Sequence, residues 1–350
     1  MKNKLLKWYD QNNYEFPWRN CNDPYKTWIS EVMLQQTQVK TARPYFDKWM
    51  LRFPTVIDVA NSDIDIILKY WEGLGYYSRA HNIKKASNII CNSMNNKLPD
   101  NEKLKDLPGI GDYMYGAIMS IAFSKPLSAI DGNVKRVFSR LLCKNFESTQ
   151  DIRELKEYIE NKIHKKRPGC FNQAIMDLGR EICKPSNPIC IECPIKKICK
   201  AYNQKVVFDY PKKTVRKSVP SFDVVVGFIT DKDKNFLITK RPKDKMLGGL
   251  WEVPGGKREK GESLKNGLIR ELKEEINVDV GIDRKIGMIQ HSYSHMNIKL
   301  HGYECNIKRG KIKKNQCDDL KWINVSQINR YTFPKANHKL FSIIKDYYVS

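Results

Sequence analysis

The sequence has no long hydrophobic run. Its longest apolar stretches, such as residues 117–123, fall far short of the ~20 residues that a membrane-spanning helix requires. The N-terminal sequence MKNKLLKW also carries charge too early for a secretory signal peptide. We therefore expect a cytoplasmic protein with no membrane partner, associated with the nucleoid if it is bacterial. In the cytoplasm the ten cysteines should stay reduced or bind metal.

Acidic residues are scarce. The 350 residues include 39 acidic and 62 basic side chains, which gives a formal net charge of +23. Such an excess favours a polyanionic partner, because each phosphate neutralised by Lys or Arg releases a condensed counterion. Charge alone does not separate a nucleic-acid enzyme from a ribosome-associated or merely basic protein. The hydrophobic share of 41% excludes a disordered or collagen-like chain.

The cysteines are unevenly distributed. Six are scattered and are expected to act as small buried hydrophobic residues: Cys21, Cys91, Cys143, Cys170, Cys305 and Cys317. The other four form a C-x6-C-x2-C-x5-C pattern within 17 residues: Cys183, Cys190, Cys193 and Cys199. Four thiolates in so short a segment can converge on one metal site. The spacing leaves zinc and an iron–sulfur cluster open, since both accept four thiolates.

The pattern of the chain changes near residue 200. Amphipathic helical runs continue to about residue 180, and a basic, proline-containing stretch at 202–220 has the composition of a linker. Short β-branched runs at 222–229 and 236–239 then predict strands. Further along we expect a charged helix, more strands and a final helix, at 262–277, 286–305 and 335–348. The sequence thus predicts a multidomain protein, with an all-α domain of about 200 residues and an α+β domain of about 130.

A glycine-containing turn, LPGIG at 107–111, lies between two helical stretches. Gly109 and Gly111 allow a tight turn that brings backbone N–H groups to a helix N-terminus, where they can bind phosphate. An ordinary helix–helix turn is the alternative interpretation. The sequence IDGNVKR at 130–136, which includes Lys135, favours the functional one.

These motifs together resemble those of the helix–hairpin–helix DNA glycosylases that carry a 4Fe–4S cluster. PWR at 17–19, WISEVMLQQTQ at 28–38 and GLGYY at 73–77 are similar to the adenine DNA glycosylase (MutY type) branch. The resemblance covers nearly the whole chain. It implies a 4Fe–4S cluster on the four clustered cysteines. It also implies a monomer that acts on double-stranded DNA with adenine opposite 8-oxoguanine or guanine.

Two carboxylates have the pattern that N-glycosidic cleavage needs, one protonated and one ionised. Glu31 lies inside an apolar run, where desolvation should raise its pKa and suit it to general-acid work. The resemblance implies that Glu31 protonates adenine and that Asp131 stabilises the cationic sugar. Tyr113 stands where the related endonuclease III branch has a lysine that attacks the sugar. A phenol cannot form that Schiff base, so we expect a monofunctional glycosylase in which Tyr113 assists the sugar intermediate.

DNA contacts are expected from the hairpin glycines and from residues of the matching motifs: Arg19, Gln36, Tyr76, Gly109, Gly111 and Lys135. The Gln36 amide can probe the opposite strand, and the Tyr76 ring can stack in the space that an extruded base leaves. Tyr76 and Tyr77 cannot both point the same way. The family has small residues where this chain has Met114 and Tyr115, and the effect of this departure on the hairpin stays open.

The second domain contains most of a Nudix box: Gly256, Glu262, Arg270, Glu271, Glu274 and Glu275. The last three glutamates share one helical face and can hold Mg²⁺. Asn277 replaces the final glycine, and Asn also tolerates a left-handed cap. In adenine glycosylases this domain resembles a Nudix hydrolase but recognises 8-oxoguanine. Tyr293, Ser294 and His295 resemble the lesion-reading loop of the family.

Three alternatives remain beside a monofunctional adenine glycosylase. They are an endonuclease III-like glycosylase and lyase, a nucleotide pyrophosphohydrolase that uses the Nudix helix, and a DNA-binding module without catalysis. The resemblance divides the chain into a glycosylase domain at 1–202 with a cluster loop at 183–199, a basic linker at 203–220 and a Nudix-like domain at 221–350.

Overall fold

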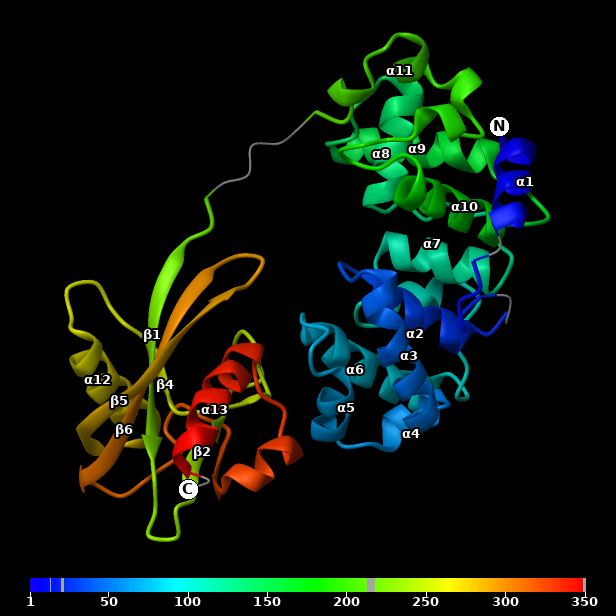
Figure 1. Cartoon of the computed structure of the whole chain (residues 1–350). Helices are drawn as coiled ribbons and strands as arrows, with labels where there is room; N and C mark the ends of the chain where they lie inside the picture. The colour runs from blue at the N-terminus through cyan, green and yellow to red at the C-terminus, as the bar shows by residue number, and fades with distance from the viewer. Residues whose placement is uncertain (13, 20–21, 213–217, 349–350) are drawn as a thin grey trace. The chain divides into compact units, whose positions relative to one another are not determined.

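The computed structural model describes residues 1–12, 14–19, 22–212 and 218–348. Cys21 and the linker residues Lys213, Arg216 and Lys217 lie outside the described residues. The chain forms two compact units, one of residues 1–62 and 82–215 and one of residues 63–81 and 216–350. Both are drawn in Figure 1. No described helix is long and apolar enough to cross a membrane.

The first unit is built from helices, as the amphipathic runs predict. Their bounds are α1 Lys2–Asn12, α2 Pro24–Leu34, α3 Val39–Arg52, α4 Val56–Asn61, α6 Ser78–Ser93, α7 Asp112–Ile121, α8 Gly132–Leu142, α9 Thr149–Lys162, α10 Pro168–Glu181 and α11 Lys200–Asn203. Four short 3₁₀ turns belong to it as well: η1 Glu102–Asp106, η2 Cys190–Glu192, η3 Lys196–Ile198 and η4 Val207–Asp209. The first residues of α6 belong to the second unit.

Two glycines let the helices around the site approach closely. A Cβ at Gly116 of α7 would lie 2.0 Å from the Ser128 carbonyl oxygen. A Cβ at Gly179 of α10 would lie 2.7 Å from the Asn133 Cβ atom. Both distances are shorter than any van der Waals contact, so only glycine fits. These contacts bring α7 against the segment that leads into α8 and α10 against the first turn of α8, on either side of Asp131.

The second unit is an α+β fold with two sheets. A four-stranded sheet has the order β4-β1-β6-β5, and a three-stranded sheet has the order β3-β2-β7. The strands are β1 Ser221–Ile229, β2 Phe236–Lys240, β3 Trp251–Glu252, β4 Gly255–Lys257, β5 Asp279–Ser292, β6 Asn297–Arg309 and β7 Asp319–Ile323. β1 runs parallel to β6 and antiparallel to β4. The predicted strands at 222–229, 236–239 and 286–305 are confirmed.

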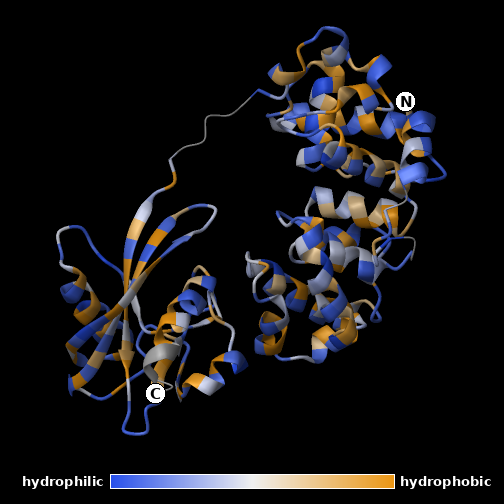
Figure 2. Ribbon diagram, viewed as in Figure 1, coloured by the Kyte–Doolittle hydropathy of each residue, from blue (hydrophilic) through white to orange (hydrophobic). Residues whose placement is uncertain are grey.

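Two helices cover opposite faces of the four-stranded sheet. Residues of α12 Leu264–Ile276 form one apolar core with alternate residues of β1. Residues of α13 Lys335–Tyr348 and the turn η5 Val325–Arg330 form the other core. Both predicted helices are present (Figure 1). In Figure 2, bands of apolar and polar residues alternate along β5 and β6, as expected for strands with a covered face.

Residues 63–81 pack with this second unit. They include α5 Ile64–Trp71, followed by the GLGYY segment. The Glu72 carboxylate accepts a hydrogen bond from the Phe333 backbone N–H at 3.0 Å and lies 2.7 Å from His338 Nε2. Lys69 donates to the Tyr331 carbonyl at 2.9 Å. The predicted domain boundaries near residues 202 and 221 divide the chain by motif rather than by contact, and they stay a prediction.

Candidate active site

A cleft in the first unit brings together residues from four parts of the sequence. Glu31 comes from α2, Tyr113 from the first turn of α7, Asp131 from the residue before α8, and Gln173 from α10. The cleft also contains Arg19 and Gln36, two of the predicted DNA-contact residues. Residues that are up to about 150 positions apart in the sequence thus line one site.

Glu31 lies on the buried face of α2. This helix begins after Asp23, whose carboxylate accepts hydrogen bonds from two backbone N–H groups, and Pro24 occupies the first helical position. Only 6% of Glu31 is exposed, and its Oε2 atom accepts a hydrogen bond from the Tyr113 hydroxyl at 2.5 Å. Burial raises the pKa of Glu31 to about 7, while the Tyr113 hydrogen bond acts in the opposite direction. The predicted direction of this pKa is confirmed.

Asp131 is the N-cap of α8. One carboxylate oxygen accepts the Val134 backbone N–H at 2.7 Å, and the other accepts the Asn133 side-chain amide at 2.9 Å. Burial raises the pKa of Asp131, and these hydrogen bonds limit the rise. The structural role as a cap and the predicted role in the cleft therefore fall on the same carboxylate. Asp131 also raises the pKa of Glu31 by its charge, so the two groups are electrostatically coupled.

A charged and aromatic wall of the cleft is not foreseen by the motifs. Asp177 on α10 is 1% exposed and pairs with Arg19 at 2.8 Å and with Arg180 at 3.0 Å. The two guanidinium groups lie over the Phe16 ring at 4.8 Å and the Tyr14 ring at 4.9 Å, respectively. An acidic residue inside the apolar run FNQAIMDLG is the same signal that singles out Glu31, so Asp177 could have been found by it.

The turn at 107–111 has the backbone that glycine favours at one of its two glycines. Gly109 has φ of +85°, whereas Gly111, the N-cap of α7, has an ordinary φ of −93°. Its neighbour Met114 is buried, while Tyr115 is half-buried and its ring lies under the Lys105 ammonium at 4.5 Å. Tyr115 therefore packs beside the hairpin. Lys135, on the first turn of α8, is half-buried.

The two predicted probing residues share an unusual backbone conformation. Gln36 and Tyr76 have φ values of +56° and +46°, in the left-handed region that residues other than glycine seldom adopt. Gln36 is exposed at the mouth of the cleft. Tyr76 is 42% exposed, whereas Tyr77 is 7% exposed. The two tyrosines thus point in different directions, with Tyr76 outward.

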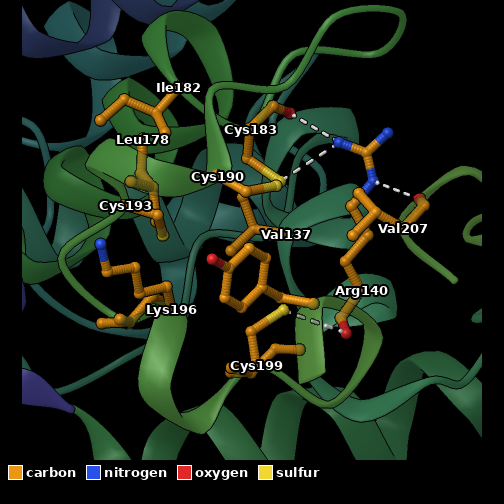
Figure 3. Close-up of a pocket in the computed structure, with 13 residues that line it drawn as sticks. Val137, Arg140, Leu178, Ile182, Cys183, Cys190, Cys193, Lys196, Cys199 and Val207 are labelled. Carbon is orange, nitrogen blue, oxygen red and sulfur yellow. Dashed lines mark hydrogen bonds between the residues drawn. The ribbon is translucent and has the colours of Figure 1, made fainter. Parts of the chain in front are cut away.

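The four clustered cysteines line one enclosed, mostly apolar pocket (Figure 3). Its walls include Val137 of α8 and Leu178 of α10. Arg140 donates hydrogen bonds to Cys183 Sγ at 3.3 Å and to the carbonyls of Lys184 and Val207 at 2.7 and 3.1 Å. None of the four thiols is in a disulfide. Among the described residues no three Cys, His, Asp or Glu side chains are placed to share a single metal ion.

The scattered cysteines differ from the expectation in part. Cys305 and Cys317 are buried, but Cys91, Cys143 and Cys170 are only half-buried. Cys91 and Cys170 lie within α6 and α10, and Cys143 ends α8 in a left-handed conformation.

The three glutamates of the Nudix helix have different environments. Glu275 is buried and accepts the Gly255 N–H at 2.8 Å, and burial raises its pKa to about 8. Arg270 contacts Glu262, Glu271 and Glu274 in ion pairs at 2.8, 3.1 and 3.3 Å. Asn277 ends the helix with φ of +61°, which confirms the predicted left-handed cap.

The predicted lesion-reading loop connects β5 and β6. The Tyr293 ring is half-buried between His291 and His295, with centroid distances of 4.6 and 6.3 Å. Ser294 and His295 are exposed, and His295 Nε2 lies 3.2 Å from the Met246 sulfur. Burial raises the pKa of Tyr293 to about 12. The loop therefore exposes two polar side chains beside a half-buried ring, and Ser294 Oγ lies 3.4 Å from His295 Nδ1.

Comparisons with known proteins agree with this arrangement. The family described as "HhH-GPD superfamily base excision DNA repair protein" matches residues 29–162, and the NUDIX domain family matches residues 225–342. The solved structure of a thermostable thymine-DNA glycosylase is 28% identical, with a TM-score of 0.54, and covers 58% of this chain and 94% of its own. This likeness supports the helical glycosylase fold.

Two relatives match nearly the whole chain. The human adenine DNA glycosylase is 28% identical over 98% of this chain and 73% of its own length. That of Buchnera aphidicola subsp. Schizaphis graminum (strain Sg) is 34% identical over 97% of both chains. Since this identity extends over both units and the carboxylates share one cleft, the chain belongs to the adenine DNA glycosylase family, enzymes of base excision repair.

Proposed function

We propose that this enzyme removes adenine opposite 8-oxoguanine or guanine by monofunctional hydrolysis of the N-glycosidic bond. The observation that carries the proposal is the Glu31 carboxyl group, buried against Tyr113 with a pKa of about 7, in the same cleft as Asp131. A carboxyl with this pKa is protonated in a useful fraction near neutral pH.

Glu31 acts as the general acid. Its proton passes to N7 of the extruded adenine, and the bond from C1′ to N9 breaks with both electrons moving to the base. Asp131 is ionised and stabilises the positive charge that develops on the sugar. Water then adds to C1′ and returns its proton to Glu31, which leaves adenine and an abasic site.

Tyr113 holds Glu31 in place and does not form a covalent bond to the sugar. Its hydroxyl donates to Glu31 Oε2 at 2.5 Å, and burial together with the neighbouring carboxylates raises its pKa well above 10. The neutral phenol is a donor and a poor nucleophile. These contacts support hydrolysis without the lyase step of the endonuclease III branch.

The four cysteines hold a 4Fe–4S cluster in this proposal. A single zinc ion with Zn–S bonds of about 2.3 Å would need sulfurs roughly 4 Å apart. Among the described residues, no three Cys, His, Asp or Glu side chains are placed to share one ion. One pocket lined by all four thiols instead suits a larger group. Cys183, Cys190, Cys193 and Cys199 would hold the cluster, and a bound cluster would brace the loop 183–199, where the exposed Lys197 can face phosphates.

The second unit reads the lesion, with Tyr293, Ser294 and His295 as the contacting residues. A Nudix hydrolase would need its glutamates to bind Mg²⁺. Here Arg270 pairs with three of the glutamates and Glu275 bonds to the backbone. These contacts favour recognition over hydrolysis.

The test is single-turnover cleavage of synthetic duplexes. The A:8-oxoguanine duplex should lose adenine fastest, A:G more slowly, and the A:T control should stay intact. Glu31→Gln should lower the rate of adenine release by on the order of 10²–10⁴-fold, the usual contribution of general-acid catalysis. Absence of an abasic product, or activity that survives Glu31→Gln, would contradict the proposal.

Two further assays separate the alternatives. Borohydride trapping of a covalent enzyme–DNA adduct would indicate a lyase, and none is expected with Tyr113. Release of pyrophosphate from 8-oxo-dGTP, lost in Glu274→Gln, would indicate a Nudix hydrolase. Ser294→Ala and His295→Ala should reduce the preference for A:8-oxoguanine over A:G and leave the A:G rate unchanged.

A further inference from the structure

In the segment from Trp71 to Arg79, an unusual backbone conformation exposes the Tyr76 side chain. Gly73, Gly75 and Tyr76 have φ values of +102°, +70° and +46°. A non-glycine residue in this region costs on the order of 1 kcal/mol or more, so other contacts must hold Tyr76 there. The conformation turns Tyr76 outward and Tyr77 inward.

Arg79 supplies those contacts from beneath the segment. Its side chain is 8% exposed, and its Nη2 atom donates to the carbonyls of Leu74 and Gly75 at 3.0 and 3.1 Å. The guanidinium lies 5.2 Å from the Trp71 ring centroid and 5.6 Å from that of Tyr76. One buried cation therefore joins two loop carbonyls, a core ring and the exposed ring.

Trp71 completes the arrangement. Its Nε1 atom donates to the Gly75 carbonyl at 3.1 Å, the same oxygen that accepts from Arg79. The Gly75 peptide is thus fixed by two donors immediately before Tyr76. A fixed peptide restricts the direction in which the next side chain leaves the backbone.

We propose that Arg79 is a positioning residue that holds Tyr76 in its outward orientation for insertion into the DNA base stack. The inference rests on the proposed role of Tyr76 and adds a residue that the sequence motifs did not single out. An ordered ring binds with a smaller loss of side-chain entropy than a free one. Arg suits this role because its planar guanidinium can donate hydrogen bonds to carbonyls and stack on an aromatic ring at the same time. The Lys ammonium does not stack in that way.

The test is a double-mutant cycle in the Glu31→Gln background, where cleavage of bound DNA is expected to be on the order of 10²–10⁴-fold slower and binding is measured before it occurs. The variants are Tyr76→Ala, Arg79→Lys and both together. The measured quantity is the ratio of Kd for a matched A:T duplex to Kd for an A:8-oxoguanine duplex. Base–aromatic stacking of about 1–3 kcal/mol corresponds to a loss of roughly 5- to 150-fold in this ratio for Tyr76→Ala. Arg79→Lys should lose several-fold, and the double variant should lose no more than Tyr76→Ala alone.

Tyr77→Phe is the matched control. It removes the hydroxyl that accepts the Gly73 N–H at 3.3 Å and leaves the Arg79 contacts intact. A ratio near that of the parent is expected, which would separate ring positioning from general loosening of the segment. Arg79→Gln is a second variant if Arg79→Lys does not fold, because its amide can still donate to a carbonyl but provides no cation beneath Tyr76. It should lose several-fold too.

The outcomes are distinguishable. If Tyr76→Ala leaves the ratio unchanged, the proposed insertion of Tyr76 is wrong, and the role of Arg79 is wrong with it. If Tyr76→Ala lowers the ratio but the effect of Arg79→Lys multiplies with it, Arg79 does not act through Tyr76 and only this inference is overturned. An unchanged ratio in a folded Arg79→Lys variant overturns it as well.

Discussion

At the scale of single residues, the site depends on a carboxyl group in a place unfavourable to its charge. Glu31 is buried among apolar side chains of α2, and the Tyr113 hydroxyl at 2.5 Å compensates the loss of water only in part. A group kept protonated near pH 7 is useful as an acid and costly for the fold above that pH. The same burial therefore determines the expected chemistry and a stability cost.

Glu31→Gln should stabilise the protein at neutral pH. The pKa of Glu31 is about 7 in the folded chain against an ordinary value of 4.5, so the unfolded chain releases this proton between pH 4.5 and 7 while the folded chain keeps it. Folding stability thus falls as pH rises through that window, by up to about 3 kcal/mol. The uncharged glutamine avoids this loss.

Denaturant unfolding of both proteins at pH 5 and pH 8 measures the effect. The variant should exceed the parent in free energy of unfolding at pH 8, and the gap should shrink at pH 5. A gap of equal size at both pH values would mean that Glu31 is not the titrating group.

The pH–rate profile should be bell-shaped. Protonated Glu31 is required, so the rate falls as pH rises through about 7. Ionised Asp131 is required, so the rate also falls on the acid side, at a pH above the usual Asp range because burial raises the pKa of Asp131.

Tyr113→Phe removes the hydrogen bond that lowers the pKa of Glu31, so the alkaline limb of the pH–rate profile should move to higher pH. Single-turnover rates from pH 5 to 9 measure this, and an unmoved alkaline limb in the variant would assign that limb to another group.

At the scale of elements, α8 connects the cleft to the cysteine pocket. Its first residue follows Asp131, and its third turn carries Arg140. Arg140 donates to Cys183 Sγ, to the Lys184 carbonyl inside the cysteine loop and to the Val207 carbonyl beyond it. Asn133 and Arg136 of the same helix continue this link: Arg136 donates to the Asn133 side-chain oxygen and to the Cys183 carbonyl, both at 2.8 Å. One helix thus orients the second carboxylate and anchors the loop.

Arg140→Met should weaken retention of the cluster. The variant keeps an apolar stem of similar length but loses the donors to the Cys183 sulfur and to the carbonyls of Lys184 and Val207. Iron per chain and the visible absorbance of the purified protein should both decrease. Lys197→Met, in the exposed part of the same loop, is the control and should keep full iron content. Full iron in Arg140→Met would show that the thiols alone hold the group.

The elements were predictable where the local pattern determines them. The β-branched run at 222–229, the charged helix with its Asn277 cap and the helix at 335–348 all form as expected, because periodicity and capping are local properties. Glu31 was singled out by its apolar neighbours. Asp177 carries the same signal as Glu31, but its pair with Arg19 depends on how α10 packs against the segment before α2. The Arg79 contacts depend on a loop whose shape the sequence pattern does not specify.

At the scale of the whole molecule, the charge of +23 should dominate the affinity for DNA and contribute little to discrimination. Contacts between Lys or Arg and phosphates do not depend on base sequence, and their free energy comes largely from counterion release. The proposed contacts of Tyr76, Ser294 and His295 involve bases instead. Affinity and specificity should therefore respond differently to salt.

Binding of Glu31→Gln to an A:8-oxoguanine duplex and to a matched duplex should both weaken steeply as salt rises. If the enzyme neutralises six to ten phosphates, affinity should drop on the order of 10³- to 10⁵-fold between 50 and 200 mM salt. The ratio of the two affinities should change far less, because stacking and hydrogen bonds to bases release few ions. Fluorescence anisotropy over a salt series gives both quantities. Plots of log Kd against log salt should give parallel lines for the two duplexes. A shallower line for the A:8-oxoguanine duplex than for the matched duplex would mean that the lesion contacts replace phosphate contacts instead of adding to them.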